Sequence, residues 1–155
     1  MRVYRIVKNL ARTRDLSGNG AFRAGGRWND KGSYVLYTSE TSSLALLENV
    51  VHFDNEELPE QLYIMEIEID DSNGKIFTLP QLGYPEDWKD LDNLNSKSLG
   101  DDFFKAHNYL GLKVRSALNP LESNILLDPL FAGYHELVQV VLITEIKVDT
   151  RFGKA

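Results

Sequence analysis

Residues 25–53 read GGRWNDKGSYVLYTSETSSLALLENVVHF, and this stretch joins a turn, a short strand and a helix. Gly, Asn and Asp are typical of turns, so GGRWNDKG predicts one. SYVLYTS (33–39) is a short apolar run that predicts a buried strand. Residues 39–53 switch to helical spacing, and Ser and Thr are available there as N-caps. Residues 25–53 therefore predict a turn, a buried strand and a helix, in that order.

A glutamate, Glu48, lies at the edge of the apolar face of this predicted helix. At about 100° per residue, a stripe about 100° wide holds Leu44, Leu47, Glu48 and Val51. A buried carboxylate requires a cation, hydrogen-bond donors or a raised pKa. Either Glu48 reaches solvent or a structural arginine, or it is a catalytic carboxylate at the rim of a pocket. The helical pattern alone favours the structural interpretation.

Arginines gather in the N-terminal part of the chain. Arg27 follows two glycines, and a guanidinium presented from such a turn can bind phosphate through two parallel hydrogen bonds. Most Gly-Gly pairs are simply turns, so the motif alone is weak. Arg5, Arg12, Arg14 and Arg23 add positive charge to the same region. This local excess of cations predicts an anion-binding site.

Other polar residues give weaker indications. Tyr37 on the predicted strand can stack on a planar ring, or it can pack in the core. Ser116 in VRSAL has no G-x-S-x-G context, so the sequence predicts no hydrolase elbow. The three histidines lack metal-ligand spacing, and we expect no metal site.

Outside the central stretch, the chain predicts mostly strands. VYRIV (3–7) is an opening strand, EQLYIMEIEID (60–70) alternates as a half-exposed strand does, and residues 114–129 form two strands around a turn. ELVQVVLITEIKVD (136–149) is long and β-branched, which predicts a strand in the centre of a sheet.

Two further segments complete the pattern. Residues 11–32 lack periodicity and predict a long loop, whereas residues 101–113 predict a short helix that ends near Gly111. Strands and helices do not alternate regularly, which excludes a doubly wound fold. We therefore expect a single α+β domain dominated by strands, spanning residues 1–155.

Composition excludes several classes of protein. The 155 residues carry a net charge of −6, which argues against direct binding of nucleic acid. The chain has no cysteine, so disulfides and thiolate chemistry are excluded. We see neither a signal peptide nor an apolar run long enough to span a membrane, and we expect a cytoplasmic protein.

Three stretches together resemble the RES domain, a family named after an Arg, a Glu and a Ser. They are YRIV near the start, GGRWNDKGSYVLYTSETSSLALLE in the middle and VRSALNPLESNILLDP near the end. On this mapping Arg27, Glu48 and Ser116 are the name-giving residues, and Tyr37 is the aromatic between them. The last motif departs from the family at Arg115, where proline is common, and at Asp128, where asparagine is common.

The resemblance implies an ADP-ribosyltransferase-like fold and the toxin of a bacterial type II toxin–antitoxin pair. It implies that NAD+ is consumed as a substrate, by hydrolysis or phosphorolysis, with no further cofactor. On this resemblance Glu48 would stabilise the oxocarbenium-like state of the ribose. Arg27 and Arg5 would hold the pyrophosphate of NAD+. Tyr37 would stack on nicotinamide, and Ser116 would bind the substrate or orient Glu48. The implied partner is an Xre-like helix-turn-helix antitoxin that covers the active site. A homodimer of the toxin is also possible on this resemblance.

Two alternatives remain open at this point. One is an ADP-ribosyltransferase that modifies a specific protein. The other is a non-catalytic module that binds a nucleotide in the arginine-lined pocket. Whether the acceptor is water, phosphate or a protein is not fixed by the sequence.

Overall fold

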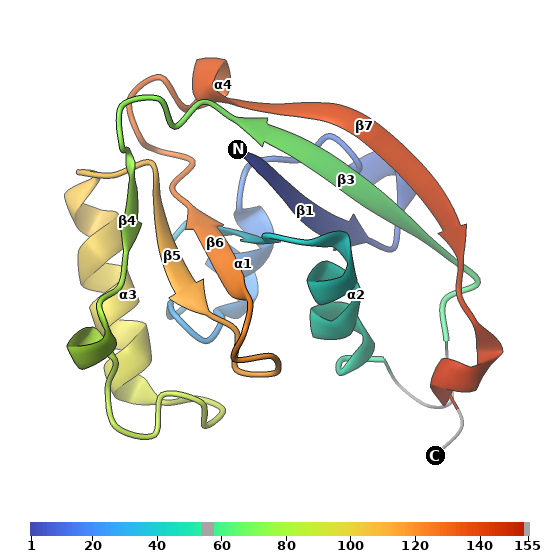
Figure 1. Ribbon diagram of the computed structural model, residues 1–155, viewed down its shortest axis with the longest axis horizontal. Coiled ribbons are helices and arrows are strands. Elements are labelled where there is room, and N and C mark those ends of the chain that lie inside the picture. The colour runs from blue at the N-terminus through green and yellow to red at the C-terminus, as the bar shows by residue number, and fades with distance from the viewer. Residues whose placement is uncertain (54–57, 154–155) are drawn as a thin grey trace.

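Among the residues that the structure describes, seven strands form one mixed sheet in the order β4-β5-β6-β2-β1-β3-β7 (Figure 1). The computed structural model describes residues 1–53 and 58–153. β4 and β5 are parallel, and the other neighbouring strands are antiparallel. The strands are β1 (Arg2–Val7), β2 (Leu36–Ser39), β3 (Gln61–Ile69), β4 (Ile76–Thr78), β5 (Gly111–Arg115), β6 (Ser123–Leu127) and β7 (Val138–Lys147). The predicted α+β class is confirmed.

Helices are few and short in the described part of the chain. The α-helices are α1 (Asn19–Ala24), α2 (Ser42–Val50), α3 (Leu94–Ala106) and α4 (Tyr134–Leu137). Short 3-10 helices cover Leu10–Arg12, Gln81–Gly83 and Thr150–Gly153. None of the helices described has the length and apolarity needed to cross a membrane.

The core follows from the alternation along β3. Met65, Ile67 and Ile69 are buried on one face, and the sequence predicted this face correctly. They pack with residues of β1, β2 and β6 in the largest apolar cluster. A second cluster packs Phe104 of α3 against Leu112 of β5, so α3 covers the β5 end of the sheet.

The sheet opens between β1 and β2. β1 pairs with β3 over six residues, but its pairing with β2 is limited to Tyr4 opposite Ser39. Figure 1 shows the consequence, because β1, β3 and β7 run diagonally to β4, β5 and β6. Backbone groups that face this opening lack a strand partner, so other groups must satisfy them. Helix α2 contacts both β1 and β2 beside the opening.

The structure corrects the predicted position of the last strand. β7 lies at the edge of the sheet and not at its centre, and Val141 and Leu142 are 47% and 53% exposed. β-branched residues favour any strand that packs on one face, so their number does not report a central position.

Two predicted boundaries are also wrong. The predicted loop 11–32 contains α1, and α3 begins at Leu94 and ends at Ala106, so that Gly111 starts β5. The buried face of α3 is formed by Ser96, Gly100 and Phe104, spaced four residues apart. Serine and glycine give no apolar signal, which hid the first two turns of this helix.

Candidate functional site

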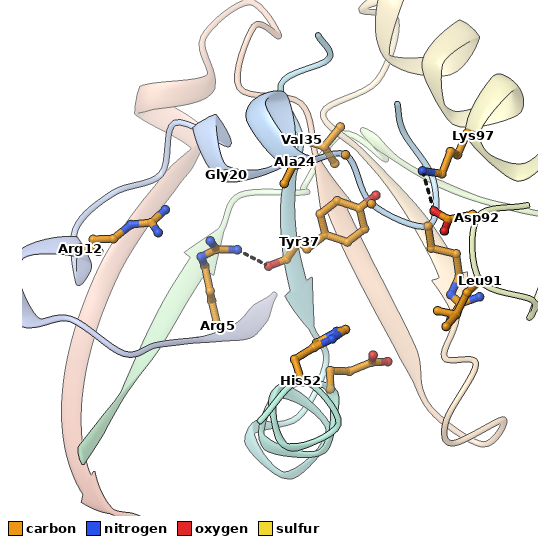
Figure 2. Close-up of a pocket in the computed structure, with 15 residues that line it drawn as sticks. Arg5, Arg12, Gly20, Ala24, Val35, Tyr37, His52, Leu91, Asp92 and Lys97 are labelled. Atoms are coloured by element: carbon orange, nitrogen blue, oxygen red, sulfur yellow. Dashed lines mark hydrogen bonds and ion pairs between the residues drawn. The ribbon is translucent and has the colours of Figure 1, made fainter. Parts of the chain in front are cut away.

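A cavity of about 440 Å³ lies at the opening between β1 and β2. It is lined from β1 by Arg5, from β2 by Tyr37, from α2 by Glu48 and from the turn before β2 by Arg27. We call it the main cavity. Figure 2 shows Arg5 and Arg12 on one side of Tyr37, with Asp92 and Lys97 on the other.

Glu48 is held by two hydrogen bonds from the ends of β5 and β6. Its Oε1 accepts from Oγ of Ser116 at 2.8 Å and from Nδ2 of Asn124 at 2.7 Å. Oγ of Ser39 donates to Oδ1 of Asn124 at 2.8 Å, which fixes the orientation of the amide. These donors compensate the carboxylate of Glu48. The predicted apolar face of α2 is wrong in part, because Leu44 is buried whereas Leu47 and Val51 are 40% and 53% exposed. Within residues 1–53 and 58–153, no hydrogen bond reaches Oε2 of Glu48, which stays available to a substrate.

Ser116 orients Glu48 from inside the protein. Its side chain is buried, with a residue exposure of 0%. Its Oγ also accepts from the backbone N–H groups of Leu118 at 3.0 Å and Asn119 at 3.1 Å. With its hydroxyl used in this way, the geometry supports the orienting role and not direct contact with substrate.

The loop between β5 and β6 is tied to the start of α2. Thr41, the N-cap of α2, accepts from the N–H of Leu44 and donates to Oε1 of Glu122 at 2.9 Å. Nδ2 of Asn119 donates to the other carboxylate oxygen of Glu122 at 3.0 Å. The loop that carries Ser116 therefore keeps a fixed distance from the helix that carries Glu48.

Arg5 is a half-buried cation with no carboxylate partner among the residues that the structure describes. Its Nη1 donates to the backbone oxygen of Tyr37 at 3.1 Å, across the opening in the sheet, and its Nε is buried with no hydrogen-bond partner in the described ranges 1–53 and 58–153. Burial lowers the pKa of Arg5 below its ordinary value, and the nearby Arg12 cation lowers it further. Arginine ion pairs in the described part of the chain involve only Arg2, Arg12 and Arg151. A buried, unpaired guanidinium is costly, and a bound anion would compensate it.

Arg27 has two structural roles. Its Nη1 donates to the backbone oxygens of Trp88, Lys89 and Asp90, which anchors the segment before α3. The same side chain lines the main cavity, as does Leu91 from the anchored segment. Arg27 therefore shapes one wall of the cavity and keeps its other N–H groups for a ligand.

The Gly-Gly-Arg-Trp-Asn turn is built around Tyr37. A Cβ on Gly26 would lie 2.5 Å from the Tyr37 hydroxyl, so this position requires glycine. The hydroxyl accepts from the N–H of Trp28 at 3.1 Å and donates to Oδ1 of Asn29 at 2.7 Å. Burial raises the pKa of Tyr37 above its ordinary value, so the hydroxyl stays protonated. The turn therefore holds the hydroxyl end of the Tyr37 ring, and Tyr37 lines the main cavity.

Three residues of the site were not singled out from the sequence. Asn124 lies within the quoted motif VRSALNPLESNILLDP, but only the antiparallel pairing of β5 with β6 brings it to Glu48. His52 lines the main cavity from the turn that follows α2, where its N–H donates to the backbone oxygen of Asn49. Lys97 lines the cavity from α3, and its pairing with Asp92 at 3.2 Å has no sequence signal.

The lining of the main cavity is positively charged. Four cations, Arg5, Arg12, Arg27 and Lys97, face two carboxylates, Glu48 and Asp92. Asp92 already pairs with Lys97. Within the described residues, no group of three or more His, Cys, Asp or Glu is arranged to hold a metal ion. The cavity suits a polyanionic ligand that places one electron-poor centre near Glu48.

Two smaller cavities adjoin the main one. The helix-side cavity, of about 320 Å³, lies between α2, β1 and β2 and includes Ser39, Asn49 and Asn124 in its lining. The sheet-side cavity, of about 60 Å³, is lined by Arg27 and Arg115 over an apolar floor. Tyr37 and Glu48 line all three cavities.

Known proteins match most of this chain or nearly all of it. The family model described as RES domain matches residues 2–144. A protein named Toxin Res from Photorhabdus laumondii is 30% identical over 100% of this chain and 99% of its own. Another Toxin Res, from Yersinia enterocolitica, is 33% identical over 97% of this chain and 99% of its own. A protein from a Sphingobium species, named Prs ADP-ribosylating toxin, is 35% identical over 74% of this chain and 73% of its own.

A solved structure shares the fold. It is the crystal structure of the MbcT–MbcA toxin–antitoxin complex of Mycobacterium tuberculosis, with a TM-score of 0.72 and 19% identity. The match covers 94% of this chain and 84% of the matched chain. At this identity the likeness establishes the arrangement of strands and helices, and the chemistry of the site rests on the residues described above.

Proposed function

The chain belongs to the RES domain family, and we propose that it is a toxin that consumes NAD+ by cleaving the bond between nicotinamide and ribose. The observation that carries this proposal is that one cavity holds both the oriented carboxylate of Glu48 and the half-buried guanidinium of Arg5, which has no carboxylate partner among the described residues. NAD+ combines the two matching features, a pyrophosphate and a ribose that becomes positively charged as its bond to nicotinamide breaks.

The bond-breaking step suits an unprotonated carboxylate. As the bond from the anomeric carbon to the ring nitrogen breaks, its electron pair moves to the nitrogen and nicotinamide leaves as a neutral molecule. The ribose then resembles an oxocarbenium ion, and a nearby negative charge stabilises it. In this proposal Glu48 supplies that charge through Oε2, while Ser116 and Asn124 hold Oε1. The leaving group needs no metal ion or further cofactor.

The other residues bind and orient the substrate. Arg5 and Arg27, which both line the main cavity, would hold the pyrophosphate there. The ring of Tyr37 would stack on nicotinamide, because its hydroxyl is already used by the turn. Ser116 acts through Glu48 as a positioning residue. The proposed place of action is the cytoplasm, which contains the substrate.

The direct test is release of nicotinamide. The purified chain, free of any antitoxin, is incubated with NAD+, and nicotinamide is separated by chromatography. We expect NAD+ to disappear in step with nicotinamide release. Folded protein that leaves NAD+ intact would refute the proposal, and NAD+ binding without loss would favour the nucleotide-binding module instead.

Arg5→Gln should weaken NAD+ binding. It removes a half-buried cation that no carboxylate of the described residues compensates. A charge-assisted hydrogen bond contributes about 1.5–3 kcal/mol, so we expect KM for NAD+ to rise about tenfold or more. Arg23→Gln is the matched control, because Arg23 is exposed on α1 and does not line the main cavity. Steady-state kinetics and a melting curve of each variant are the measurements. Equal KM values for the two folded variants would show that Arg5 does not bind NAD+.

Transfer of ADP-ribose to a protein is the second candidate. The Sphingobium relative, named Prs ADP-ribosylating toxin, favours it. Both reactions begin by cleaving the bond between nicotinamide and ribose, and they differ only in the group that accepts the ADP-ribose. Labelled NAD+ separates the two, because transfer moves the label into a macromolecule, whereas hydrolysis or phosphorolysis leaves it in small molecules.

The proposed partner is an Xre-like helix-turn-helix antitoxin. The MbcT–MbcA structure is that of a toxin in complex with its antitoxin, which supports an antitoxin for this chain as well. Leu91 on the cavity wall is 81% exposed, and Val51 at the end of α2 is 53% exposed. Apolar side chains beside a charged cavity suit a partner that covers it. A homodimer of the toxin stays an expectation.

A further inference from the structure

The hydroxyl hydrogen of Ser116 has only one direction left to it. Its Oγ already accepts from the backbone N–H groups of Leu118 and Asn119, at 3.0 and 3.1 Å. A hydroxyl oxygen has two lone pairs and one hydrogen, so these two bonds leave Ser116 only a donor role. The acceptor is Oε1 of Glu48, which lies 2.8 Å from Oγ. The conformation of the loop at 116–119 therefore decides how Glu48 is oriented.

Glu122 holds this part of the loop through its side chain and its backbone. Its Oε2 accepts from Nδ2 of Asn119 at 3.0 Å. Its N–H donates to the backbone oxygen of Asn119 at 3.1 Å, and its backbone oxygen accepts from the N–H of Ser116 at 2.9 Å. Asn119 is thus fixed at both ends, and its own N–H is one of the two that Ser116 accepts. The direction of the Ser116 hydroxyl therefore depends on Glu122.

The other carboxylate oxygen of Glu122 is bonded to helix α2. Oε1 accepts from Oγ1 of Thr41 at 2.9 Å, and Thr41 is the N-cap of α2. Glu48 follows Thr41 on this helix by about two turns, at about 3.6 residues per turn, so the two residues lie on the same side of α2. One carboxylate therefore joins the helix that carries Glu48 to the loop that carries Ser116.

We propose that Glu122 is a positioning residue of the NAD+-cleaving site, and that it acts by directing the hydroxyl of Ser116 to Glu48. The inference rests on the proposed cleavage of NAD+. Glu122 is half-buried, and it is not among the described residues that line the three cavities, so it acts without touching the substrate. Its role is geometric, because what it supplies is two acceptors at the distance that separates Thr41 from Asn119.

Three substitutions separate the reach of this side chain from its charge. Glu122→Ala removes both side-chain bonds, and Glu122→Asp keeps the charge but is too short to reach both partners. Glu122→Gln keeps the length, and its amide can accept from Asn119 and donate to Oγ1 of Thr41, since a hydroxyl also accepts.

The three variants should differ in the rate of nicotinamide release. Displacement of a catalytic group by about 1 Å costs up to about 100-fold, so we expect kcat to fall about tenfold for Glu122→Ala, less for Glu122→Asp and least for Glu122→Gln. KM for NAD+ should change less than about twofold in all three, because Glu122 acts on Glu48 and not on substrate binding. Higher activity of the aspartate variant than of the glutamine variant would mean that charge matters and not reach, and this result overturns the inference.

Glu40→Ala is the matched control. Glu40 joins the same two segments, because its carboxylate accepts from the N–H of Ser123 at 2.7 Å and pairs with Lys113 at 3.3 Å. Neither of these bonds involves Ser116. Glu40→Ala should therefore lower the melting temperature about as much as Glu122→Ala but leave kcat within about twofold of the unmodified chain. Equal kcat values for the two folded alanine variants would show that Glu122 has only a structural role.

A double-mutant cycle tests the route from Glu122 to Glu48. Ser116→Ala removes the hydroxyl, so in this background Glu122→Ala should lower kcat further by less than about twofold, compared with about tenfold in the unmodified chain. An equal effect in both backgrounds would mean that Glu122 acts by another route, which overturns the inference and leaves NAD+ cleavage in place. Absence of nicotinamide release from the folded, unmodified chain refutes the proposed function itself.

Discussion

Glu48→Gln will reduce the rate of nicotinamide release by a factor of roughly 100 to 1,000, the usual cost of removing one electrostatic group that stabilises a transition state. Glutamine has the shape of glutamate and keeps a carbonyl oxygen. That oxygen can still accept from Ser116 and Asn124, which bond Oε1 of Glu48 at 2.8 and 2.7 Å. The substitution removes the negative charge and leaves the scaffold, so the melting temperature should change little. Its effect will fall on kcat and not on KM for NAD+.

Glu145→Gln provides the matched control for this experiment. Glu145 is exposed on β7, outside all three cavities, and its substitution changes the net charge of the chain by the same amount. Nicotinamide release by the two variants is compared at saturating NAD+. If folded Glu48→Gln protein turns over as fast as the control, Glu48 does not take part in the reaction.

The sequence predicted much of what surrounds Glu48. The turn before Tyr37, the strand and the helix that follows were all expected, and the alternation of β3 gave the buried face of the sheet correctly. These features are local, because periods of two and of about 3.6 residues report burial within one element. The structure brings Glu48 and Ser116 into contact, as the orienting role of Ser116 requires.

Other parts of the site depend on contacts between distant segments. Asn124 reaches Glu48 only because β6 pairs with both β5 and β2, and no local pattern reports this register. The anchoring of the segment before α3 by Arg27 joins residues about sixty positions apart. The predicted central position of β7 was wrong for a related reason, because strand propensity does not report the order of strands in a sheet.

Gly100→Ala will destabilise the protein by about 3 kcal/mol or more, at the upper end of the cost of overpacking. A Cβ on Gly100 would lie 1.6 Å from the backbone oxygen of Trp28. Trp28 is 2% exposed and packs in the second apolar cluster, so its backbone cannot yield without disturbing that cluster. Alanine favours helix over glycine by only about 1 kcal/mol, which is too little to offset this overlap.

The displacement should also reach the site. Helix α3 would have to move away from the turn that carries Arg27, and the carboxylate of Asp101, which accepts from the N–H of Asp30 and the hydroxyl of Ser33, would move with it. For a chain of this size we expect the melting temperature to fall by about 6–12 °C, and we expect nicotinamide release to fall too. Gly20→Ala is the matched control, because the nearest atom to a Cβ there is Nη2 of Arg12 at an ordinary 3.6 Å. Melting curves followed by circular dichroism compare the two variants. Equal melting temperatures would mean that α3 does not pack against the Gly-Gly-Arg-Trp-Asn turn, and that the wall of the main cavity has another support.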